Sequence, residues 1–527
     1  MALVVLAAYG LTHPDAVASL GRLYDDVVYL SVGKSIADGE GYRSAHLVGT
    51  PVHVKFPPLL PAVYAVAWRT LGTLSAVANA AMWLNVAVAS AAAGLLWWLT
   101  RRELGVGVVV CALFVIVPML TDRTMFYFSG AMSEPWMLLG WVVALILVCR
   151  LAEFRAGGEE APGTAIALGL VLAAAMLARA QSVAVAAGVI AGAGLMRVGW
   201  RPFFVTIVST AIPTVAWRFW HGAMIARGPV SPLPDQLSYA SWLPTGISEL
   251  TDLAALMVRI SVPLYWRNTA DLLVGWTSAK TLALAAAIVI WGLIGLVALA
   301  RRFPALGTSV AAMIVVTVTW PYVQDRFLTP VLPVLGVAGA YATQRVVDRS
   351  PRVLRNVMTG ALALAAIVLL GVNLRARFES ARGQLRAPFS VALTGIVDWV
   401  NQNTSASERV MVPWGGAIYL RTGRRTSIPN PEEALVGPTV FDSPRRFLAT
   451  RILVDTVDVV VIWNRAPGRA AAWLRGMALR CPGSLTEERT STDLSGLHFY
   501  RVRRDLPCLR QLATTRVESG AQNNNAP

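Results

Sequence analysis

Charged side chains recur in the polar segments that separate long apolar runs, and these residues can do chemistry on a polar substrate. A carboxylate in such a segment can act as a general base, and a cation can bind an anion such as phosphate. The acidic candidates are Asp25, Asp26, Glu134 and Asp325. The basic candidates are Lys55, Arg179 and Arg326. The residue types therefore indicate acid–base and anion-binding sites.

The acidic candidates also have ordinary structural explanations. Asp25 and Asp26 precede a helical pattern at 27–37, and carboxylates stabilise the first turn of a helix. Glu134 lies in the segment Ser133–Pro135, which has the cap and the proline of a good helix start. Each of these carboxylates can therefore be a capping group only, and the sequence leaves both explanations open.

The remaining polar candidates have equally simple alternatives. Lys55 can bind any lipid phosphate, and Asp325 and Arg326 can form a local ion pair. His53 and His221 are single histidines in interfacial segments, where a histidine is usually only polar surface. A functional assignment therefore depends on whether these residues lie on the same side of a membrane.

The composition identifies a polytopic membrane protein. Of the 527 residues, 55% are apolar and 14% are charged, whereas a soluble domain carries about 25% charged residues. The mean hydropathy is +0.56, which excludes a disordered chain, a coiled coil and an ordinary soluble enzyme. The net charge of +16 is not concentrated in one soluble module, so nucleic acid is not an expected partner.

Eleven apolar segments are candidates for membrane-spanning helices, which need about 20 apolar residues. The first is short and has neither a basic flank nor a small-residue cleavage site, so we do not interpret it as a signal peptide. The predicted spans are Met1–Thr12, Leu74–Thr100, Leu104–Leu120, Pro135–Leu151, Thr164–Ala178, Ser182–Met196, Phe203–Ala216, Thr281–Ala300, Leu306–Trp320, Leu328–Gln344 and Val353–Val372.

Arginines orient the predicted spans, because positive residues in short loops resist translocation. They occur in every second loop along the chain: Arg101 and Arg102, Arg150 and Arg155, Arg197 and Arg201, Arg301 and Arg302, and Arg345, Arg349, Arg352 and Arg355. We therefore expect a bacterial cytoplasmic-membrane protein with its N-terminus in the cytoplasm and its C-terminus exported. All the candidate residues then lie on the outer side, where a helical bundle can gather them over one cavity.

Two outer loops are long and contain apolar stretches that are too short to span a bilayer. These stretches are Pro57–Leu71 and Leu253–Trp266, and we expect them to form interfacial helices.

The part of the chain after the last span differs in composition and alternates helical with strand patterns. We predict a membrane module at 1–374, an exported α/β domain at 375–515 and a disordered tail at 516–527. The predicted helices are Val391–Asn401, Pro444–Asp455 and Pro467–Leu479, and the predicted strands are Arg409–Pro413, Val457–Trp463 and Gly496–Val502. Export permits a disulfide between Cys481 and Cys508.

Several of these motifs together resemble the GT-C glycosyltransferases that use polyprenyl-phosphate sugars, a family that includes protein O-mannosyltransferases and the lipid A aminoarabinose transferase. Asp25-Asp26-x-x-Tyr29 is similar to the acidic motif of the first outer loop in that family. The other matching segments are Gly39-x-Gly41-Tyr42, Lys55-x-Pro57-Pro58-Leu59, Ser133-Glu134-Pro135, Arg179 and Asp325-Arg326-Phe327-x-x-Pro330-x-x-Pro333. The resemblance covers nearly the whole chain and implies a polytopic α-helical, GT-C-like fold.

The resemblance also implies a reaction. The donor would be a sugar on undecaprenyl or decaprenyl phosphate, and the acceptor a hydroxyl group of a lipid, a glycan or a protein. Asp25 would be the general base, with Asp26 as the substitute, and a single displacement would invert the anomeric carbon. Glu134 would orient the acceptor, or bind a divalent metal together with an aspartate. No further cofactor is implied.

The resemblance assigns roles to the remaining candidates in two groups. Those that would bind the donor phosphate are Lys55, Arg326 and Arg179. Those that would contact the sugar or the acceptor are Tyr29, Tyr42, His53, His221 and Asp325.

Two other classes of protein fit the composition. A lipid or glycan transporter or flippase usually has ionisable residues at mid-membrane or broken helices in paired repeats, and the sequence has few of the former and no visible repeat. A non-catalytic cell-envelope assembly protein would use the exported domain to bind partners. The acidic and basic residues of the outer loops argue against that class only modestly.

Overall fold

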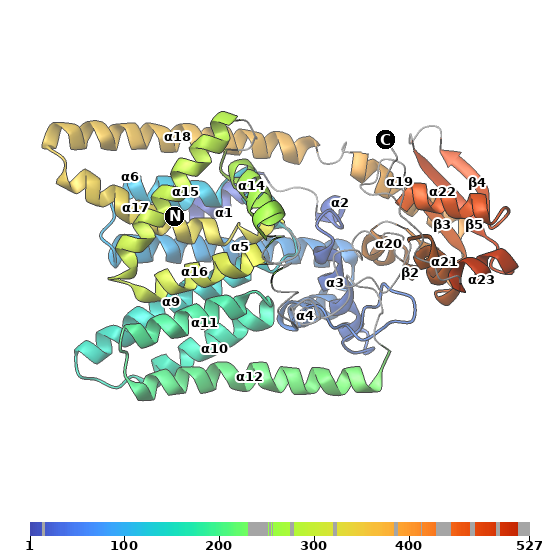
Figure 1. The fold of residues 1–527 in the computed structure, drawn as a ribbon, viewed down its shortest axis with the longest axis horizontal. Helices are drawn as coiled ribbons and strands as arrows, with labels where there is room; N and C mark the ends of the chain where they lie inside the picture. The colour runs from blue at the N-terminus through green and yellow to red at the C-terminus, as the bar shows by residue number, and fades with distance from the viewer. Residues whose placement is uncertain are drawn as a thin grey trace. The chain divides into compact units, whose positions relative to one another are not determined.

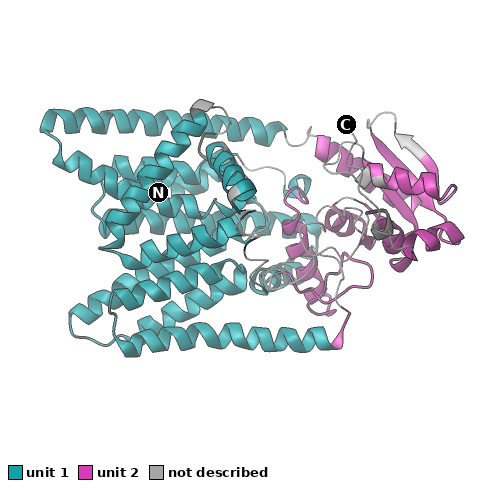
Figure 2. Ribbon diagram, viewed as in Figure 1, with its two compact units in different colours: residues 1–19, 56–226, 242–384 teal, residues 20–55, 227–241, 385–527 magenta. Residues whose placement is uncertain are grey.

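The chain folds as two compact units in a computed structural model (Figures 1 and 2). Unit 1 comprises Met1–Ser19, Phe56–Ala226 and Trp242–Gln384, and unit 2 comprises Leu20–Lys55, Arg227–Ser241 and Leu385–Pro527. The structure describes residues 1–12, 16–229, 251, 255, 257–274, 279–319, 324–383, 388–412, 414–427, 444–463, 470–491 and 496–514. The predicted tail at 516–527 lies outside these residues.

Unit 1 is a helical bundle, and most of the described residues in each of the eleven predicted spans are helical. The helices before residue 160 are α1 (Ala2–Leu11), α2 (Ala16–Ser19), α4 (Leu59–Leu71), α5 (Leu74–Arg102), α6 (Val108–Cys111), the π-helical turn η1 (Ala112–Ile116), α7 (Val117–Met119), α8 (Asp122–Ser129) and α9 (Glu134–Ala156). The later ones are α10 (Pro162–Ala178), α11 (Ser182–Leu195), α12 (Trp200–Arg227), η4 (Met257–Ser261), α14 (Val262–Val274), α15 (Ala279–Ala300), α16 (Pro304–Thr319), η5 (Asp325–Phe327), α17 (Val331–Arg349) and α18 (Arg352–Gly383).

The lengths of these helices bear on the membrane topology. Among the described residues, five helices are long and apolar enough to cross a membrane, and a bent pair, Val108–Met119 with Asp122–Ser129, makes up to six. Five further apolar helices have 10–17 residues. The first stretch predicted as an interfacial helix contains α4, and the second overlaps η4 and the first residues of α14. The structure is thus a multi-helix membrane protein, and the count of eleven spans stays a prediction.

Small residues allow a close contact between two helices in unit 1. A Cβ atom built on Gly188 would lie 2.4 Å from the Cα atom of Ser309, and one built on Gly192 would lie 2.2 Å from the Cα atom of Ala305. The backbones of α11 and α16 therefore touch without an intervening side chain, as is common in membrane helix pairs. This contact holds the second half of α11 within the bundle.

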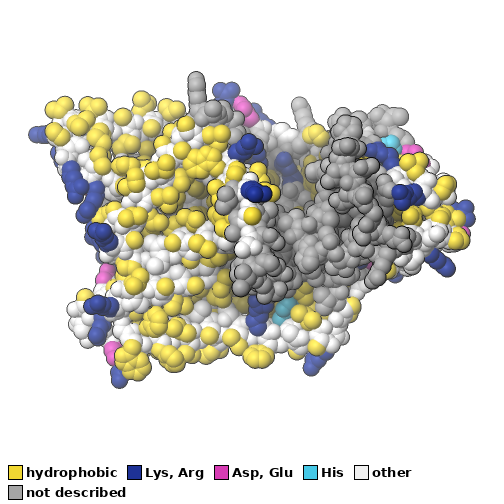
Figure 3. Space-filling view, in the orientation of Figure 1, with side chains coloured by type: hydrophobic (Ala, Val, Ile, Leu, Met, Phe, Trp, Pro, Cys, Tyr) yellow, Lys and Arg dark blue, Asp and Glu magenta, His cyan; other side chains and the backbone are white. Residues whose placement is uncertain are grey.

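The surface of unit 1 suits a bilayer. Figure 3 shows apolar side chains over its visible face and Lys and Arg side chains along its left edge. Large exposed apolar residues on its long helices include Ile212, Ile290, Val297, Leu364 and Ile367. An apolar belt that ends in basic side chains is the pattern expected of a membrane bundle.

Unit 2 is an α/β unit around a five-stranded sheet of order β2-β1-β3-β5-β4. The β1 strand pairs in parallel with β2 and β3, and β5 pairs antiparallel with β3 and β4. The strands are β1 (Val410–Met411), β2 (Thr426–Ser427), β3 (Val459–Trp463), β4 (Leu485–Ser491) and β5 (Leu497–Val502). The helices are α3 (Asp25–Ala37), α19 (Pro388–Asn403), α20 (Gly415–Thr422), α21 (Pro444–Val454), α22 (Ala470–Arg480) and α23 (Pro507–Thr514).

The six helices and strands predicted after residue 374 therefore match α19, α21, α22, β1, β3 and β5 to within a few residues. The short elements β2 and α20, and the strand β4, were not predicted. They carry too little apolar periodicity to be recognised, because β2 has two residues and β4 reads Leu-Thr-Glu-Glu-Arg-Thr-Ser.

The first outer loop belongs to the same unit as this sheet. Residues 20–55, which the sequence placed in the membrane module, pack in unit 2 with residues 385–527. Leu47 forms a parallel bridge with Thr426 of the edge strand β2, so the loop continues the sheet beyond that strand. The loop and the C-terminal sheet are one folding unit, although about 380 positions separate them.

The predicted disulfide is confirmed in unit 2. Cys481 and Cys508 are bonded, and their Cα atoms lie 5.4 Å apart. The bond joins the end of α22 to α23 across 27 positions, and such a cross-link contributes about 2–5 kcal/mol to stability. Cys111 and Cys149 are free thiols in the bundle.

We expect the disulfide to form in the cell. A denatured, unreduced chain should then take up two maleimide groups, at Cys111 and Cys149, and a reduced chain four, which mass spectrometry counts directly. The double variant Cys481→Ser/Cys508→Ser should take up two under both conditions. Uptake of four groups by the unreduced wild type would show that the C-terminal unit does not reach an oxidising compartment.

Candidate functional site

Three polypeptide segments of unit 1 meet at a buried ion cluster, which we call the Glu134 cluster: Ser133, Glu134, Arg179, Gln181, Arg326 and Phe327. Nη1 of Arg179 lies 2.9 Å from Oε1 of Glu134, and Nε of Arg326 lies 3.8 Å from the same oxygen. The Glu134 side chain is fully buried, and the side chains of Arg179 and Arg326 are 8% and 11% exposed. The structure thus brings together three of the predicted site residues.

Helix ends position the charged members of the cluster. Glu134 is the first residue of α9, where the positive end of the helix dipole favours its carboxylate. Arg179 follows the last residue of α10 and lies in the tight turn before α11. Arg326 lies in η5, a single turn of 3-10 helix. Helix ends are where backbone direction changes, so all three side chains can converge without distorting a helix.

Neutral neighbours orient the two guanidinium groups. Arg179 donates hydrogen bonds to Oε1 of Gln181 and to Oγ of Ser133, both at 2.8 Å. The ring of Phe327 lies 5.3 Å from the guanidinium carbon of Arg179 and 5.5 Å from that of Arg326, within the range of a cation–π contact. Phe327 therefore contacts both cations of the cluster.

Two guanidinium groups and one carboxylate make up the charged part of the cluster. Buried charge is costly and is normally balanced by partners of opposite sign. Asp325 lies next to Arg326 in the sequence, and its Oδ1 atom accepts a 2.5 Å hydrogen bond from the Tyr127 hydroxyl and a 3.0 Å bond from the backbone nitrogen of Arg326. The two guanidinium groups are the side chains of the cluster that can bind an anion.

Tyr265, which the sequence analysis did not select, also interacts with the two guanidinium groups of the cluster. Tyr265 of α14 is 5% exposed. Burial raises the pKa of its hydroxyl, and the backbone of Gln324 and the positive charges of Arg179 and Arg326 act in the opposite direction. Its ring therefore lies within the electric field of the cluster.

Asn85 holds the chain segment that leads into Glu134. Its Nδ2 atom donates to the carbonyl oxygens of Gly130 and Met132, the latter at 2.8 Å, and its Oδ1 atom accepts a 2.7 Å bond from Nε1 of Trp136. Asn85 is fully buried in the long apolar helix α5. A polar residue in the middle of a span is the signal that could have identified it.

In unit 2, Asp25 and Asp26 form the first turn of α3 and are 4% and 3% exposed. Asp26 has a structural role, because its carboxylate accepts hydrogen bonds from the backbone nitrogens of Gly21, at 3.0 Å, and Val27, at 2.8 Å. The N-cap residue of α3 is Tyr24, whose side chain makes no capping bond and whose φ is +60°. The structural explanation of a carboxylate at a helix start therefore applies to Asp26.

Lys55 lies at the other end of the same loop. Its Nζ atom is 5.7 Å from the centre of the Tyr24 ring, so the ammonium group is close to the residue that precedes Asp25. The side chain is half-buried. The cation and the carboxylate predicted to serve one substrate thus belong to one unit, and their roles stay predictions.

The aromatic candidates of the first loop are packed inside it. Tyr29, Tyr42 and His53 are 2%, 3% and 1% exposed. The rings of Tyr42 and His53 are 5.5 Å apart, and Nδ1 of His53 lies 2.9 Å from Oγ of Ser44. Burial, and then the neighbouring Tyr29, raises the pKa of Tyr42 well above its ordinary value. Contact of these residues with a sugar stays a prediction.

His221 lies in unit 1. It is 6% exposed on α12, and its ring stacks on that of Trp217 with centres 5.0 Å apart. His221 is thus part of an aromatic face of α12 together with Trp217.

The described residues do not favour the metal hypothesis. They contain no group of three or more His, Cys, Asp or Glu side chains that could hold a metal ion. The carboxylate of Glu134 also lies 2.9 Å from a guanidinium group, which repels a divalent cation. We therefore derive no step through a metal.

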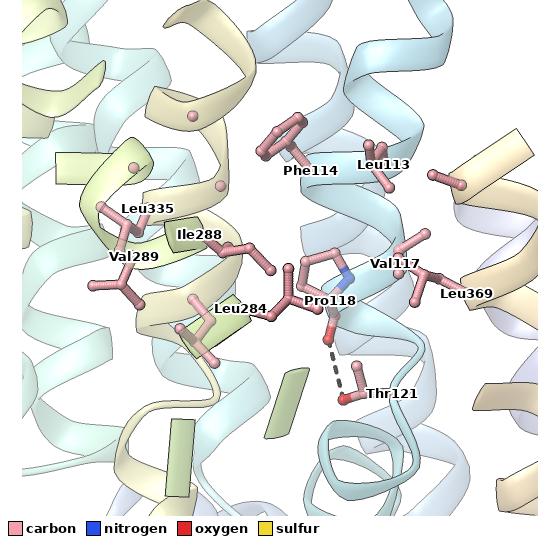
Figure 4. Close-up of a pocket in the computed structure, with 15 residues that line it drawn as sticks. Leu113, Phe114, Val117, Pro118, Thr121, Leu284, Ile288, Val289, Leu335 and Leu369 are labelled. Carbon is pink, nitrogen blue, oxygen red and sulfur yellow. Dashed lines mark hydrogen bonds between the residues drawn. The ribbon is translucent and has the colours of Figure 1, made fainter. Parts of the chain in front are cut away.

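An apolar pocket of about 200 Å³ opens between the helices of unit 1 (Figure 4). Phe114 and Val117 face it from one side, Leu284 and Ile288 of α15 from the other, and Leu369 of α18 closes it. The hydroxyl of Thr121, at one end, bonds the Pro118 carbonyl oxygen at 3.5 Å. Such a lining suits a hydrocarbon chain and not a sugar.

Comparison with solved structures identifies the fold. ArnT from Cupriavidus metallidurans bound to undecaprenyl phosphate is 13% identical, with coverage of 98% of both chains and a TM-score of 0.53. The apo state of that protein gives 14% identity, coverage of 93% and 94%, and a TM-score of 0.52. The archaeal oligosaccharyltransferase AglB from Archaeoglobus fulgidus, in complex with an inhibitory peptide and a dolichol-phosphate, is 13% identical, with coverage of 96% of this chain and 75% of AglB and a TM-score of 0.50.

These neighbours are GT-C proteins, and the similarity extends over both units of this chain. No protein-family model and no curated protein sequence matches the chain. At this low identity the similarity establishes the fold alone.

Proposed function

We propose that this chain, which has the GT-C fold, transfers a sugar from a polyprenyl-phosphate donor to an acceptor hydroxyl group at the outer face of the bacterial cytoplasmic membrane. The Glu134 cluster carries the proposal, because it holds two buried guanidinium groups against one carboxylate. Guanidinium groups in a buried site can stabilise the negative charge that develops on a departing phosphate. Arg326, at the longer distance from Glu134, is our principal phosphate ligand.

The proposed reaction is a single displacement with inversion. The acceptor oxygen forms a bond to the anomeric carbon while the bond from that carbon to the phosphate oxygen breaks. The electron pair leaves with the polyprenyl phosphate, and the acceptor proton passes to the carboxylate of Asp25 as general base. Arg179 holds Glu134 and, with Arg326, neutralises the phosphate. Asp26 is the substitute base, although its two backbone hydrogen bonds favour a structural role.

The lipid-linked donor is supported by two independent observations. One structural neighbour binds undecaprenyl phosphate and another binds a dolichol-phosphate. The pocket of unit 1 is lined by apolar side chains, which suits an isoprenoid chain. The acceptor class is a lipid, a glycan or a protein, and we propose no choice among them.

The decisive experiment is a transfer assay with the full-length chain in lipid nanodiscs. A radiolabelled sugar on undecaprenyl phosphate should move to an acceptor fraction, and free undecaprenyl phosphate should appear in equal amount. Movement of the intact donor across a proteoliposome bilayer without bond cleavage would identify a flippase. Absence of both activities, with donor binding retained, would favour an assembly protein.

Lys55→Ala should weaken donor binding by about tenfold and leave acceptor binding nearly unchanged, because the ammonium group interacts with phosphate as a point charge. Titration with undecaprenyl phosphate, followed by native mass spectrometry, measures the effect. The control is Lys34→Ala, since Lys34 is paired with Asp38 at 2.6 Å in an exposed i, i+4 contact. Equal donor affinity in both variants would reduce Lys55 to an ordinary interfacial cation.

The proposed side of the membrane makes a separate prediction. We expect an alkaline phosphatase fused to the C-terminus to be active, and a fluorescent protein fused there and exported by the Sec route to be dark. The reason is the regular alternation of arginine-bearing loops along the sequence. Bright fluorescence with an inactive phosphatase would reverse the orientation and move the proposed site to the cytoplasm.

A further inference from the structure

The first outer loop is joined to the edge of the C-terminal sheet by backbone and side-chain contacts within unit 2. The backbone nitrogen and the hydroxyl group of Thr426 both donate to the carbonyl oxygen of His46, each at 2.8 Å. The backbone nitrogen of Val48 donates to the carbonyl oxygen of Thr426 at 3.2 Å. The loop is therefore held as an additional strand segment on β2.

Apolar burial strengthens this junction. Leu47, between the two hydrogen-bonded residues, is 1% exposed and lies in the hydrophobic core of the α/β domain with Met411 and Leu448. Tyr24, directly before Asp25, packs against the same core. A leucine buried to this degree is held by about 40–60 atomic contacts, so the loop cannot leave the sheet without opening that core.

His46 links the sheet edge to α3, the helix that carries Asp25. Its ring is fully buried, and Nδ1 lies 2.9 Å from Oγ of Ser31 in the second turn of α3. Ser31 also donates to the carbonyl oxygen of Val28 at 3.0 Å, so the histidine Nδ1 is assigned as the donor to Ser31. His46 is thus bonded through its carbonyl oxygen to β2 and through its ring to α3.

The start of α3 touches α20 with no room for another methyl group. A Cβ atom on Gly416 would lie 2.7 Å from Cγ2 of Val27, and one on Gly21 would lie 2.8 Å from Cβ of Ala417. Gly21 is also the residue whose backbone nitrogen binds Asp26. The first turn of α3 is therefore confined on one face by the C-terminal domain and on the other by its own loop.

We propose, on the basis of the function proposed above, that the C-terminal α/β domain is the scaffold that positions Asp25 for catalysis. Leu47 and His46 are positioning residues in this scheme. His46 contacts α3 and the sheet edge, and Leu47 packs in the core of the domain together with Tyr24, the residue before α3. A displacement of about 1 Å of a catalytic group can cost about a hundredfold in rate. The domain therefore acts on turnover through the geometry of α3.

The experiment compares two leucines of the same core. Leu47 belongs to the first loop, and Leu448 to α21, and both are at most 1% exposed. Alanine at either position opens a similar cavity in the domain. Hydrogen exchange of residues 25–37, measured by mass spectrometry in the full-length protein, reports the order of α3 independently of activity. The transfer assay then gives kcat and the KM for the donor.

Leu47→Ala should raise exchange in 25–37 by about tenfold and lower kcat by about 10–100-fold with little change in the donor KM. Leu448→Ala should lower the unfolding temperature similarly, with exchange in 25–37 and kcat within about threefold of wild type. The volume-conserving variant Leu47→Met should have nearly wild-type hydrogen exchange in residues 25–37 and a nearly wild-type kcat.

Equal exchange of 25–37 in Leu47→Ala and wild type would overturn the scaffold role, whatever the activity. Should either alanine variant fail to fold, Thr426→Val, which removes the hydroxyl bond to His46, is compared with Thr422→Val. The Thr422 hydroxyl donates to Ile418 within α20 and accepts a bond from the backbone nitrogen of Arg424. Hydrogen exchange in residues 25–37 should then rise in Thr426→Val and not in Thr422→Val. Equal exchange in these two variants would contradict the scaffold role. A wild-type protein without transfer activity would refute the proposed function. If the Leu47 or Thr426 variant still raised hydrogen exchange in residues 25–37, the scaffold role would stand.

Discussion

Asp25→Asn is expected to fold, insert and bind the donor, and to lose about two or more orders of magnitude in turnover. The amide cannot accept the acceptor proton, while its size and its ability to stabilise a helix start are nearly those of the carboxylate. Asp25 is 4% exposed at the first position of α3, so the change is sterically conservative. Single-turnover transfer with saturating donor measures the chemical step without interference from product release.

Asp26→Asn is the matched control, because the same substitution falls on the neighbouring residue. The Asp26 carboxylate uses both oxygens to accept backbone N–H groups, of Gly21 and Val27. An amide places an N–H donor against one of those donors and should cost about 1–3 kcal/mol of stability. We therefore expect a lower unfolding temperature with turnover retained at low temperature. Near-normal turnover in Asp25→Asn together with a large loss in Asp26→Asn would exchange the two roles.

The second large effect is expected for substitutions of the two arginines of the Glu134 cluster. Substitution of Arg326 should act mainly on donor binding, and substitution of Arg179 mainly on stability. Arg326→Gln should weaken binding of undecaprenyl phosphate by about 10–100-fold, the effect of one charged hydrogen bond in a dry site. Its 3.8 Å distance from Glu134 makes it the weaker partner of that carboxylate, so stability should change little. Native mass spectrometry of the nanodisc-embedded protein measures the binding.

Arg179→Gln should act mainly on stability. It removes the partner at 2.9 Å from a fully buried carboxylate and also the bond to Ser133, and loss of one partner of a buried ion pair costs about 3–5 kcal/mol. Arg201→Gln is the control for charge alone, since Arg201 and Glu160 form a pair that is 62% exposed on both sides. Equal weakening of donor binding by Arg201→Gln and Arg326→Gln would remove the phosphate role from the cluster.

The local properties of the chain were predictable because they depend on neighbouring residues. Hydropathy located eleven helical segments, and apolar periodicity located α19, α21, α22, β1, β3 and β5. The helix start at Ser133–Pro135 follows from residue types alone, and α9 begins at Glu134 as expected. The π-helical turn at Ala112–Ile116 was not foreseen, because its sequence is as apolar as an ordinary helix.

The candidate site was predictable in part. Glu134, Arg179 and Arg326 were selected from their positions at the ends of predicted spans, and they share one cluster. Asn85 and Tyr265 were not selected, since their significance comes from contacts with distant segments. Asn85 binds carbonyl groups 45 and 47 positions away, and no local pattern in a sequence reports such a distance.

By itself, then, the sequence determined that the chain is a helical membrane protein with an α/β C-terminal domain, because hydropathy and periodicity act over one turn or one strand. Only the tertiary structure decided which polar residues meet. Leu47 and Thr426 pair across the chain because both need partners at a sheet edge, and burial of Leu47 in the domain core stabilises the contact. The domain boundary follows this burial and not the order of residues, so the proposed base Asp25 and the C-terminal sheet belong to one unit.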